Sequence, residues 1–124
     1  MPFDKAAFAK HLRDNAGPPF GKGKCATFVR QAMEAGGLST VGRPRDAKDY
    51  GPFLQRLGFQ KVEVDASYVP LTGDIAVMPG NPSSSAGHVE GWDGRNWISD
   101  FVQREVMPGP AFRTKGVYEV YRHP

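Results

Sequence analysis

The chain contains a single cysteine among its 124 residues, so it cannot form an internal disulfide. Its folding therefore does not depend on an oxidising compartment. No stretch approaches the roughly 20 consecutive apolar residues that span a bilayer, and we expect no membrane insertion. The opening residues, MPFDKAAFAKHL, lack the basic segment and apolar core of a secretory signal peptide. We therefore expect synthesis in the cytoplasm without a signal peptide, and a separate export route if the target lies elsewhere.

Metal and nucleotide motifs are also missing. There is no HExxH motif and no pair of cysteines, and the three histidines fall in separate segments, so we predict no metal and no cofactor. The stretch GPPFGKGKC resembles a phosphate-binding loop ahead of a helix. However, the residue five positions after Gly17 is Lys22, where a Walker loop requires glycine. The spacing therefore argues against nucleotide binding.

Size and charge restrict the function without identifying it. Since 124 residues provide one hydrophobic core but not two, we expect a single domain over residues 1–124. Sixteen basic against thirteen acidic side chains give a net charge of +3, which favours an anionic partner. The basic residues form no dense stripe interleaved with aromatics, so we do not expect nucleic-acid binding. A small basic binding module remains the non-enzyme alternative.

Helical segments come before strand segments along the chain. Apolar spacing predicts helices over 5–15 and 25–35 and a weaker one within 45–59. Short segments with a period of two then predict strands at 59–64, 73–79, 87–92, 95–101 and 116–123. This order predicts an α+β fold in which N-terminal helices pack on an antiparallel sheet of about five strands.

The lone cysteine, Cys25, has two interpretations. Free cysteine is among the most buried residue types, so a structural core residue is the first. The second is a nucleophile, because the first turn of a helix stabilises a thiolate and Lys22 and Lys24 add positive potential. Gly21 and Gly23 would let a substrate backbone approach. In this second interpretation the backbone N–H of Cys25 is one oxyanion donor, with the other donor unidentified.

A thiolate nucleophile needs a base, and His88 is the best candidate. It opens a predicted strand directly after the small-residue loop 80–87. A structural histidine bonded to backbone is the alternative. We expect His11, in the polar part of the first helix, and His123, the penultimate residue, to be solvated.

A third polar group would orient the histidine. The stretch HVEGWDGRNWISD predicts a hairpin, and a three-residue loop would place Asp100 beside His88. A two-residue Asp-Gly turn would instead place Ser99 opposite His88 and turn Asp100 toward solvent. Both registers remain open, with Asp100 preferred; the other polar groups within reach are Ser99, Asp93 and Glu90.

Three motifs resemble those of a known family. The stretches GKCATFVRQAMEAGG, LTGDIAVMPG and AGHVEGWDGRNWISDF are similar in order and spacing to the Cys, Gly-Asp and Gly-His motifs of NlpC-type and CHAP-type cell-wall cysteine peptidases. The resemblance implies a papain-like fold. It also implies a catalytic triad of Cys25, His88 and Asp100, in which the histidine protonates the leaving amine and then activates water.

An aspartate as the third residue, together with the small size, resembles the amidase effectors of bacterial type VI secretion, of which the third amidase-effector family is the nearest. This resemblance implies a cysteine peptidase that cleaves peptidoglycan peptides, at the D-alanine to meso-diaminopimelate cross-link, in the periplasm of a recipient cell. The implied partners are the type VI secretion apparatus and a cognate immunity protein that blocks the cleft. The enzyme alternative is a CHAP-like phage or autolysin hydrolase that cuts the γ-D-glutamyl to diaminopimelate bond.

Overall fold

The computed structural model describes residues 2–17, 24–65, 67–79, 86–99, 102–103 and 118–124. Its helices are α1 (Lys5–Asn15), α2 (Cys25–Ala35), the short 3-10 helix η1 (Ala47–Asp49) and α3 (Tyr50–Arg56). Its strands are β1 (Gln60–Val62), β2 (Ile75–Met78), β3 (His88–Trp92), β4 (Trp97–Ile98), β5 (Val102–Gln103) and β6 (Glu119–Arg122).

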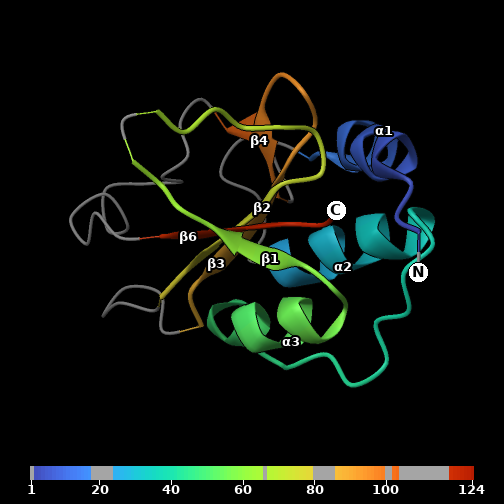
Figure 1. Ribbon diagram of the computed structural model, residues 1–124. Coiled ribbons are helices and arrows are strands. Elements are labelled where there is room, and N and C mark those ends of the chain that lie inside the picture. The colour runs from blue at the N-terminus through green and yellow to red at the C-terminus, as the bar shows by residue number, and fades with distance from the viewer. Residues whose placement is uncertain (1, 18–23, 66, 80–85, 100–101, 104–117) are drawn as a thin grey trace.

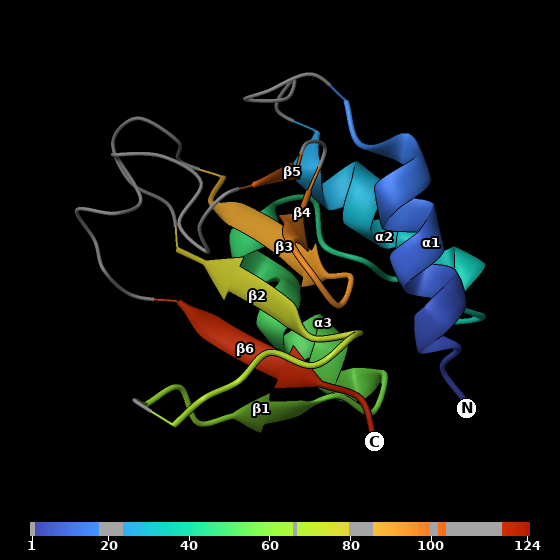
Figure 2. The ribbon, with the colours of Figure 1, turned by 90° about the horizontal axis from the view of Figure 1, so that it is seen from above.

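The strands form one antiparallel sheet in the order β1-β6-β2-β3-β4-β5 (Figures 1 and 2). The C-terminal strand β6 lies between β1 and β2, so the end of the chain is part of the sheet interior. Helix α3 covers one face of the sheet, behind the strands in the view of Figure 2, and α2 packs beside α1 and against β3. The predicted arrangement of helices on an antiparallel sheet is confirmed.

Local sequence explains the two long helices. Asp4 caps α1, because its carboxylate accepts a hydrogen bond from the backbone N–H of Ala7 at 2.9 Å. Phe8 and Leu12 lie one turn apart and are buried. They approach the backbone of Gly91 on β3 so closely that a Cβ at that position would lie 2.5 Å from the Phe8 ring. The missing side chain at Gly91 therefore lets α1 pack directly on the strand that carries His88.

Gly51 and Pro52, which weaken the prediction of a third helix, both fit within α3. Pro52 occupies the first turn, where a backbone N–H has no partner within the helix. A Cβ on Gly51 would lie 2.5 Å from the hydroxyl oxygen of Tyr121 on β6. The glycine therefore allows the helix to approach the sheet.

The other face of the sheet is covered by the chain between β1 and β2 (Figure 1). Asp74, of the Gly-Asp motif, is fully buried there and accepts two hydrogen bonds of 2.8 Å from the guanidinium of Arg122 on β6. The hydroxyl of Tyr68 donates to the same carboxylate at 2.9 Å. Burial and the charge of Asp74 raise the pKa of Tyr68. The motif thus fixes this segment to the sheet.

One predicted strand is wrong in its extent. The sequence predicts a strand through 95–101, but β4 ends at Ile98, and β5 pairs back on it with Val102 opposite Ile98. The chain therefore reverses direction within the predicted strand. The described residues contain six strands, and the short β5 is the one that the sequence segments do not predict separately.

Candidate active site

Cys25 is the first residue of α2, as the sequence predicts. Its side chain is half-buried and packs against the edge of the main hydrophobic core. The residue before it, Lys24, caps the helix without a side-chain hydrogen bond to the helix backbone. A thiol at this position is accessible and lies at the positive end of the helix dipole. The preceding residues 18–23, which include Gly21, Lys22 and Gly23, lie outside the described part of the chain.

His88 is the first residue of β3, and its side chain is only 8% exposed. The residue before it, Gly87, has a φ of 76°, a conformation that glycine adopts without strain. A Cβ at Gly87 would lie 2.4 Å from the carbonyl oxygen of Met78 and 2.7 Å from Cβ of Lys48. The glycine of the Gly-His motif is therefore required by close packing on both sides, and this packing sets where β3 begins.

The structure brings Cys25 and His88 together. The imidazole of His88 makes a side-chain hydrogen bond with Cys25. Its Nε2 atom also lies 3.2 Å from Oε1 of Glu90, a carboxylate with no exposed surface. His88 and Glu90 are two residues apart on one strand and so project from the same face. With Nε2 directed at Glu90, Nδ1 is the ring nitrogen that can face the thiol.

The two neighbours change the pKa of the imidazole. Burial alone would lower the pKa of His88, since it disfavours the charged form. The hydrogen bonds to Cys25 and Glu90, together with the negative charges of these groups, outweigh burial and raise the pKa to about 10. The site therefore brings together a thiol, an imidazole with a raised pKa and a buried carboxylate.

The predicted hairpin loop has the wrong length. Trp92 pairs with Trp97, so four residues connect the strands, rather than the two or three considered from the sequence. In addition, β4 ends at Ile98, so the regular strand assumed in both predicted registers stops before Asp100. Asp100 itself lies outside the described residues, and its role stays a prediction.

The other two polar groups considered in the hairpin are also placed. Asp93 stabilises the turn, because its carboxylate accepts hydrogen bonds from the backbone N–H groups of Arg95 at 2.9 Å and Asn96 at 2.7 Å. Ser99 is buried and follows Ile98, which pairs with Gly91. The pairing of Gly91 with Ile98 matches neither the two-residue nor the three-residue loop.

The remaining histidines do not join the site. His123 is buried rather than solvated, because its ring packs at 5.5 Å from Phe3 and 5.2 Å from Phe59. This contact joins the two ends of the chain, which sequence position alone could not show. His11 is half-exposed on α1, and its backbone carbonyl accepts a hydrogen bond from the side-chain amide of Asn15 at 2.9 Å.

The aromatic pair of the hairpin is a packing contact. Trp92 and Trp97 meet edge to face, with ring centroids 5.3 Å apart. Trp97 is buried and Trp92 is half-buried on the face of the sheet opposite to α3. These rings therefore support the strand that carries His88.

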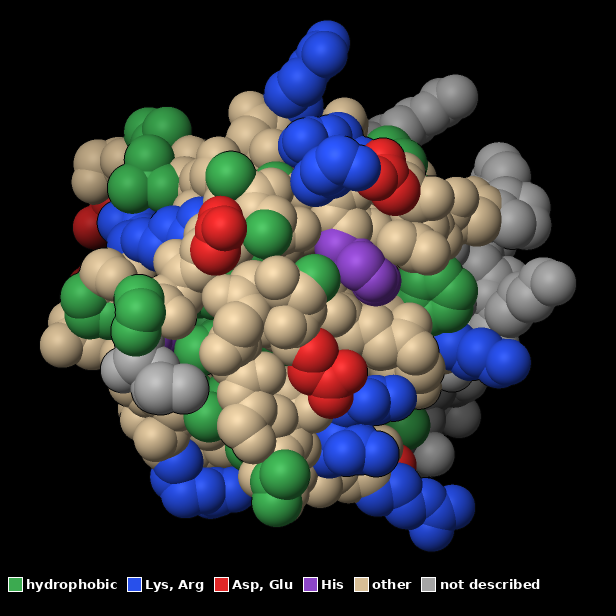
Figure 3. Space-filling view, turned by 90° about the vertical axis from the view of Figure 1, so that its right-hand side faces the viewer, with side chains coloured by type: hydrophobic (Ala, Val, Ile, Leu, Met, Phe, Trp, Pro, Cys, Tyr) green, Lys and Arg blue, Asp and Glu red, His purple; other side chains and the backbone are tan. Residues whose placement is uncertain are grey.

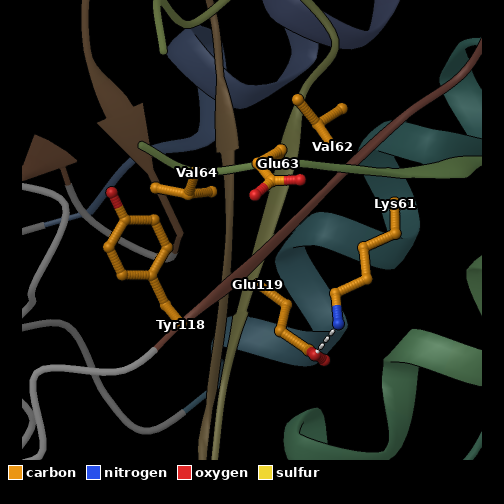
Figure 4. Close-up of a pocket in the computed structure, with 6 residues that line it drawn as sticks. All are labelled: Lys61, Val62, Glu63, Val64, Tyr118 and Glu119. Carbon is orange, nitrogen blue, oxygen red and sulfur yellow. Dashed lines mark ion pairs between the residues drawn. The ribbon is translucent and has the colours of Figure 1, made fainter. Parts of the chain in front are cut away.

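A separate groove of about 520 Å³ lies beside the edge of the sheet (Figure 4). An ion pair between Lys61 and Glu119 crosses it, and its lining does not include Cys25 or His88. Tyr118 lines this groove, and burial, followed by the charge of Glu90, raises the pKa of its hydroxyl. The groove thus marks a different surface from that of the thiol.

The basic side chains that Figure 3 displays are not gathered in one group. On the face shown in Figure 3, Lys and Arg side chains lie in several separate groups with acidic side chains near some of them. Among the described residues, no group of three or more His, Cys, Asp or Glu side chains could hold a metal ion. Within the same ranges, no helix has the length and apolar character needed to cross a bilayer.

Comparison with solved structures decides the family. The chain is 38% identical to a chain of the native type VI effector–immunity complex Tae3–Tai3 from Ralstonia pickettii, with a TM-score of 0.88. The match covers 98% of this chain and 100% of that chain. The chain belongs to the Tae3 family of type VI amidase effectors.

A second structure supports the assignment. The selenomethionine form of the Tae3–Tai3 complex from Ralstonia pickettii is 39% identical, covers 94% of this chain and 99% of that chain, and gives a TM-score of 0.83. The match to Tae3 confirms the papain-like fold and the third amidase-effector family that the sequence motifs indicate. No protein-family model and no curated protein matches the sequence.

Proposed function

We propose that this Tae3-family protein is a peptidoglycan amidase that acts as an antibacterial effector of type VI secretion. The single observation that carries the proposal is the hydrogen-bonded contact between Cys25, at the start of α2, and His88, at the start of β3. Nucleophile and base within hydrogen-bond reach form the minimal unit of thiol-based acyl transfer. The family relationship supports an amide bond of the cell wall as the substrate.

The first half of the reaction uses the charged pair. The Cys25 thiolate attacks the carbonyl carbon of the substrate amide, and the backbone N–H of Cys25 stabilises the resulting oxyanion. The imidazolium of His88 donates its proton to the leaving nitrogen, so the C–N bond breaks and a neutral amine departs. A thioester between Cys25 and the acyl half of the substrate remains.

The second half depends on the change of charge at Cys25. The negative charge of this residue is one of the causes that raise the pKa of His88, and thioester formation removes it. The imidazole therefore becomes a better base for water once the first product has left. Water loses a proton to His88 and attacks the thioester, which releases a carboxylic acid and restores the thiolate and imidazolium.

We further propose the D-alanine to meso-diaminopimelate cross-link as the bond that is cut, in the periplasm of a recipient cell. A cognate immunity protein is the corresponding partner, since both neighbouring structures are effector–immunity complexes. The alternative is a CHAP-like wall hydrolase that cuts the γ-D-glutamyl to diaminopimelate bond. The family relationship to Tae3 favours the effector.

Mass spectrometry of digested sacculi tests both the activity and the bond. Purified sacculi are incubated with wild-type protein and with Cys25→Ala, and the soluble and muramidase-released fragments are compared. Conversion of cross-linked dimers into monomers with intact stems supports the cross-link, whereas shortened stems support the γ-D-glutamyl bond. Identical fragments from wild type and variant would contradict the amidase proposal.

A further inference from the structure

The strand that carries His88 also carries a buried carboxylate in contact with it. Oε1 of Glu90 lies 3.2 Å from Nε2 of His88, and the Glu90 side chain has no exposed surface. An ionised carboxylate in such a place is strongly unfavourable unless a cation or a strong donor faces it. The ring N–H of His88 is such a donor, and the pair is charge-assisted when the imidazole is protonated.

From this geometry we propose that Glu90 is the positioning residue of the site: its carboxylate holds the His88 ring by Nε2 so that Nδ1 faces the Cys25 thiol. The proposal rests on the proposed function. It differs from the expectation that Asp100, near the next strand, performs this role. It also places both partners on one strand, two residues apart, so that the backbone of β3 alone sets their relative position.

The neighbours of the pair support this role for Glu90. Cys25 faces the imidazole from α2. Burial and then the charge of Glu90 raise the pKa of Tyr118, which lies just before β6. Ser99 is buried and follows Ile98, which pairs with Gly91, the neighbour of Glu90 on β3. Glu90 is thus enclosed between neighbouring elements, and a carboxylate enclosed in this way has little freedom to turn from the ring.

Replacing Glu90 by glutamine keeps the size and an oxygen acceptor but removes the charge. The loss of a negative charge beside the ring makes the imidazolium less favourable, so the titration midpoint of His88 moves to lower pH. In the proposed mechanism the thiolate–imidazolium form is the active one. The high-pH limb of the pH profile of kcat/KM therefore also moves to lower pH, by about one pH unit or more. We expect kcat to fall at least about tenfold with a smaller change in KM.

The experiment compares matched amide variants on soluble cross-linked muropeptides. The variants are Glu90→Gln, Asp100→Asn and, as a surface control, Glu63→Gln, whose carboxylate is exposed. We expect the largest loss of kcat and the shift of the basic limb from Glu90→Gln, and wild-type kinetics from Glu63→Gln. If Asp100→Asn causes the larger loss and the shift, Asp100 positions the ring and our assignment is overturned.

A second measurement needs neither activity nor the Glu90 variant. In Cys25→Ala, the charge of the thiolate is gone, and NMR of ¹⁵N-labelled histidine reports the titration of His88. We expect a midpoint above the ordinary value of about 6.5, because Glu90 still faces the ring. A midpoint at or below that value would overturn the assignment. An inactive wild-type protein with a raised midpoint would instead reject only the proposed function.

Discussion

The backbone N–H of Lys48 donates to the carbonyl oxygen of Ala86 at 2.9 Å. This bond joins η1 to the residue two positions before His88, and Lys48 and the carbonyl of Met78 lie close to Gly87 between them. The position of His88, the base in our proposal, is therefore set by backbone contacts from an element to which we assign no catalytic group. Rigid support of this kind is what a proton-transfer site requires, because small displacements of the base lower the rate.

Substitution of Gly87 by alanine tests this support. We expect the free energy of unfolding to fall by about 2–4 kcal/mol, through left-handed strain and a clash with the Met78 carbonyl. Activity at a temperature where the variant stays folded is expected to fall as well, because β3 must shift. Urea unfolding and kcat/KM measure the two effects.

The matched control is Gly42→Ala. Gly42 has a φ of 83°, but no atom lies within 4 Å of a Cβ placed there. We expect only the conformational cost of about 1 kcal/mol, with activity unchanged. Equal losses from the two variants would show that packing around Gly87 does not position His88.

The Gly-Asp motif has a structural role in this account. Asp74→Asn removes the charge that faces Arg122 and Tyr68. It also replaces one carboxylate oxygen, which accepts hydrogen bonds, with an amide NH₂ group, which donates them. We expect a loss of about 2–4 kcal/mol in the free energy of unfolding. Since the motif does not touch the thiol, turnover of the remaining folded protein is expected to stay within about twofold.

Thermal and urea unfolding of Asp74→Asn measure this loss, and Asp65→Asn is the control. Asp65 is exposed and serves only a local turn, through hydrogen bonds from Ser67. We expect the unfolding midpoint of Asp65→Asn to stay close to that of wild type. A stable Asp74→Asn protein with greatly lowered turnover would mean that the motif acts in catalysis instead.

The raised pKa of His88 also predicts how stability depends on pH. A group whose pKa rises on folding binds its proton more tightly in the native state, so its contribution is complete below its unfolded pKa and is lost as pH rises. With a folded pKa of about 10, the loss occurs between about pH 6.5 and 10. The free energy of unfolding of wild type minus that of His88→Gln should therefore shrink across this range. A difference that stays constant with pH would contradict the ion-pair description of the site.

The sequence was sufficient to place the two groups to which we assign the chemistry. Cys25 begins a helix with a clear apolar face, and His88 begins a strand after small residues. Both positions follow from local signals: a change from turn residues to a helical period, and a glycine followed by alternating apolar residues. The contact between them is nonlocal, and only the family resemblance connected the two positions.

Which residue of the second hairpin strand faces His88 could not be read from the sequence, because it depends on register. A single residue added to the hairpin loop changes which side chain faces His88, and the loop from Trp92 to Trp97 has four residues. Glu90 needs no register argument, since residues two apart on a strand always share a face. That simple periodicity was enough to expect the contact between Glu90 and His88, whereas the role of Asp100 rests on the resemblance to families with the third residue on the next strand and stays a prediction.

The burial of His123 was missed for a similar reason. A penultimate residue is usually solvated, but β6 lies inside the sheet and carries the end of the chain to Phe3. Strand order is a property of the whole fold, and the spacing of apolar residues within one segment does not contain it.

The most direct test of the central claim is the release of muropeptides from sacculi by wild type and by Cys25→Ala at equal folded concentration. Because the proposed mechanism places the covalent intermediate on the thiol, we expect release by the variant to fall to the level of buffer alone, with the melting temperature and circular dichroism unchanged. Release of the same fragments by a folded Cys25→Ala protein at a comparable rate would contradict the account.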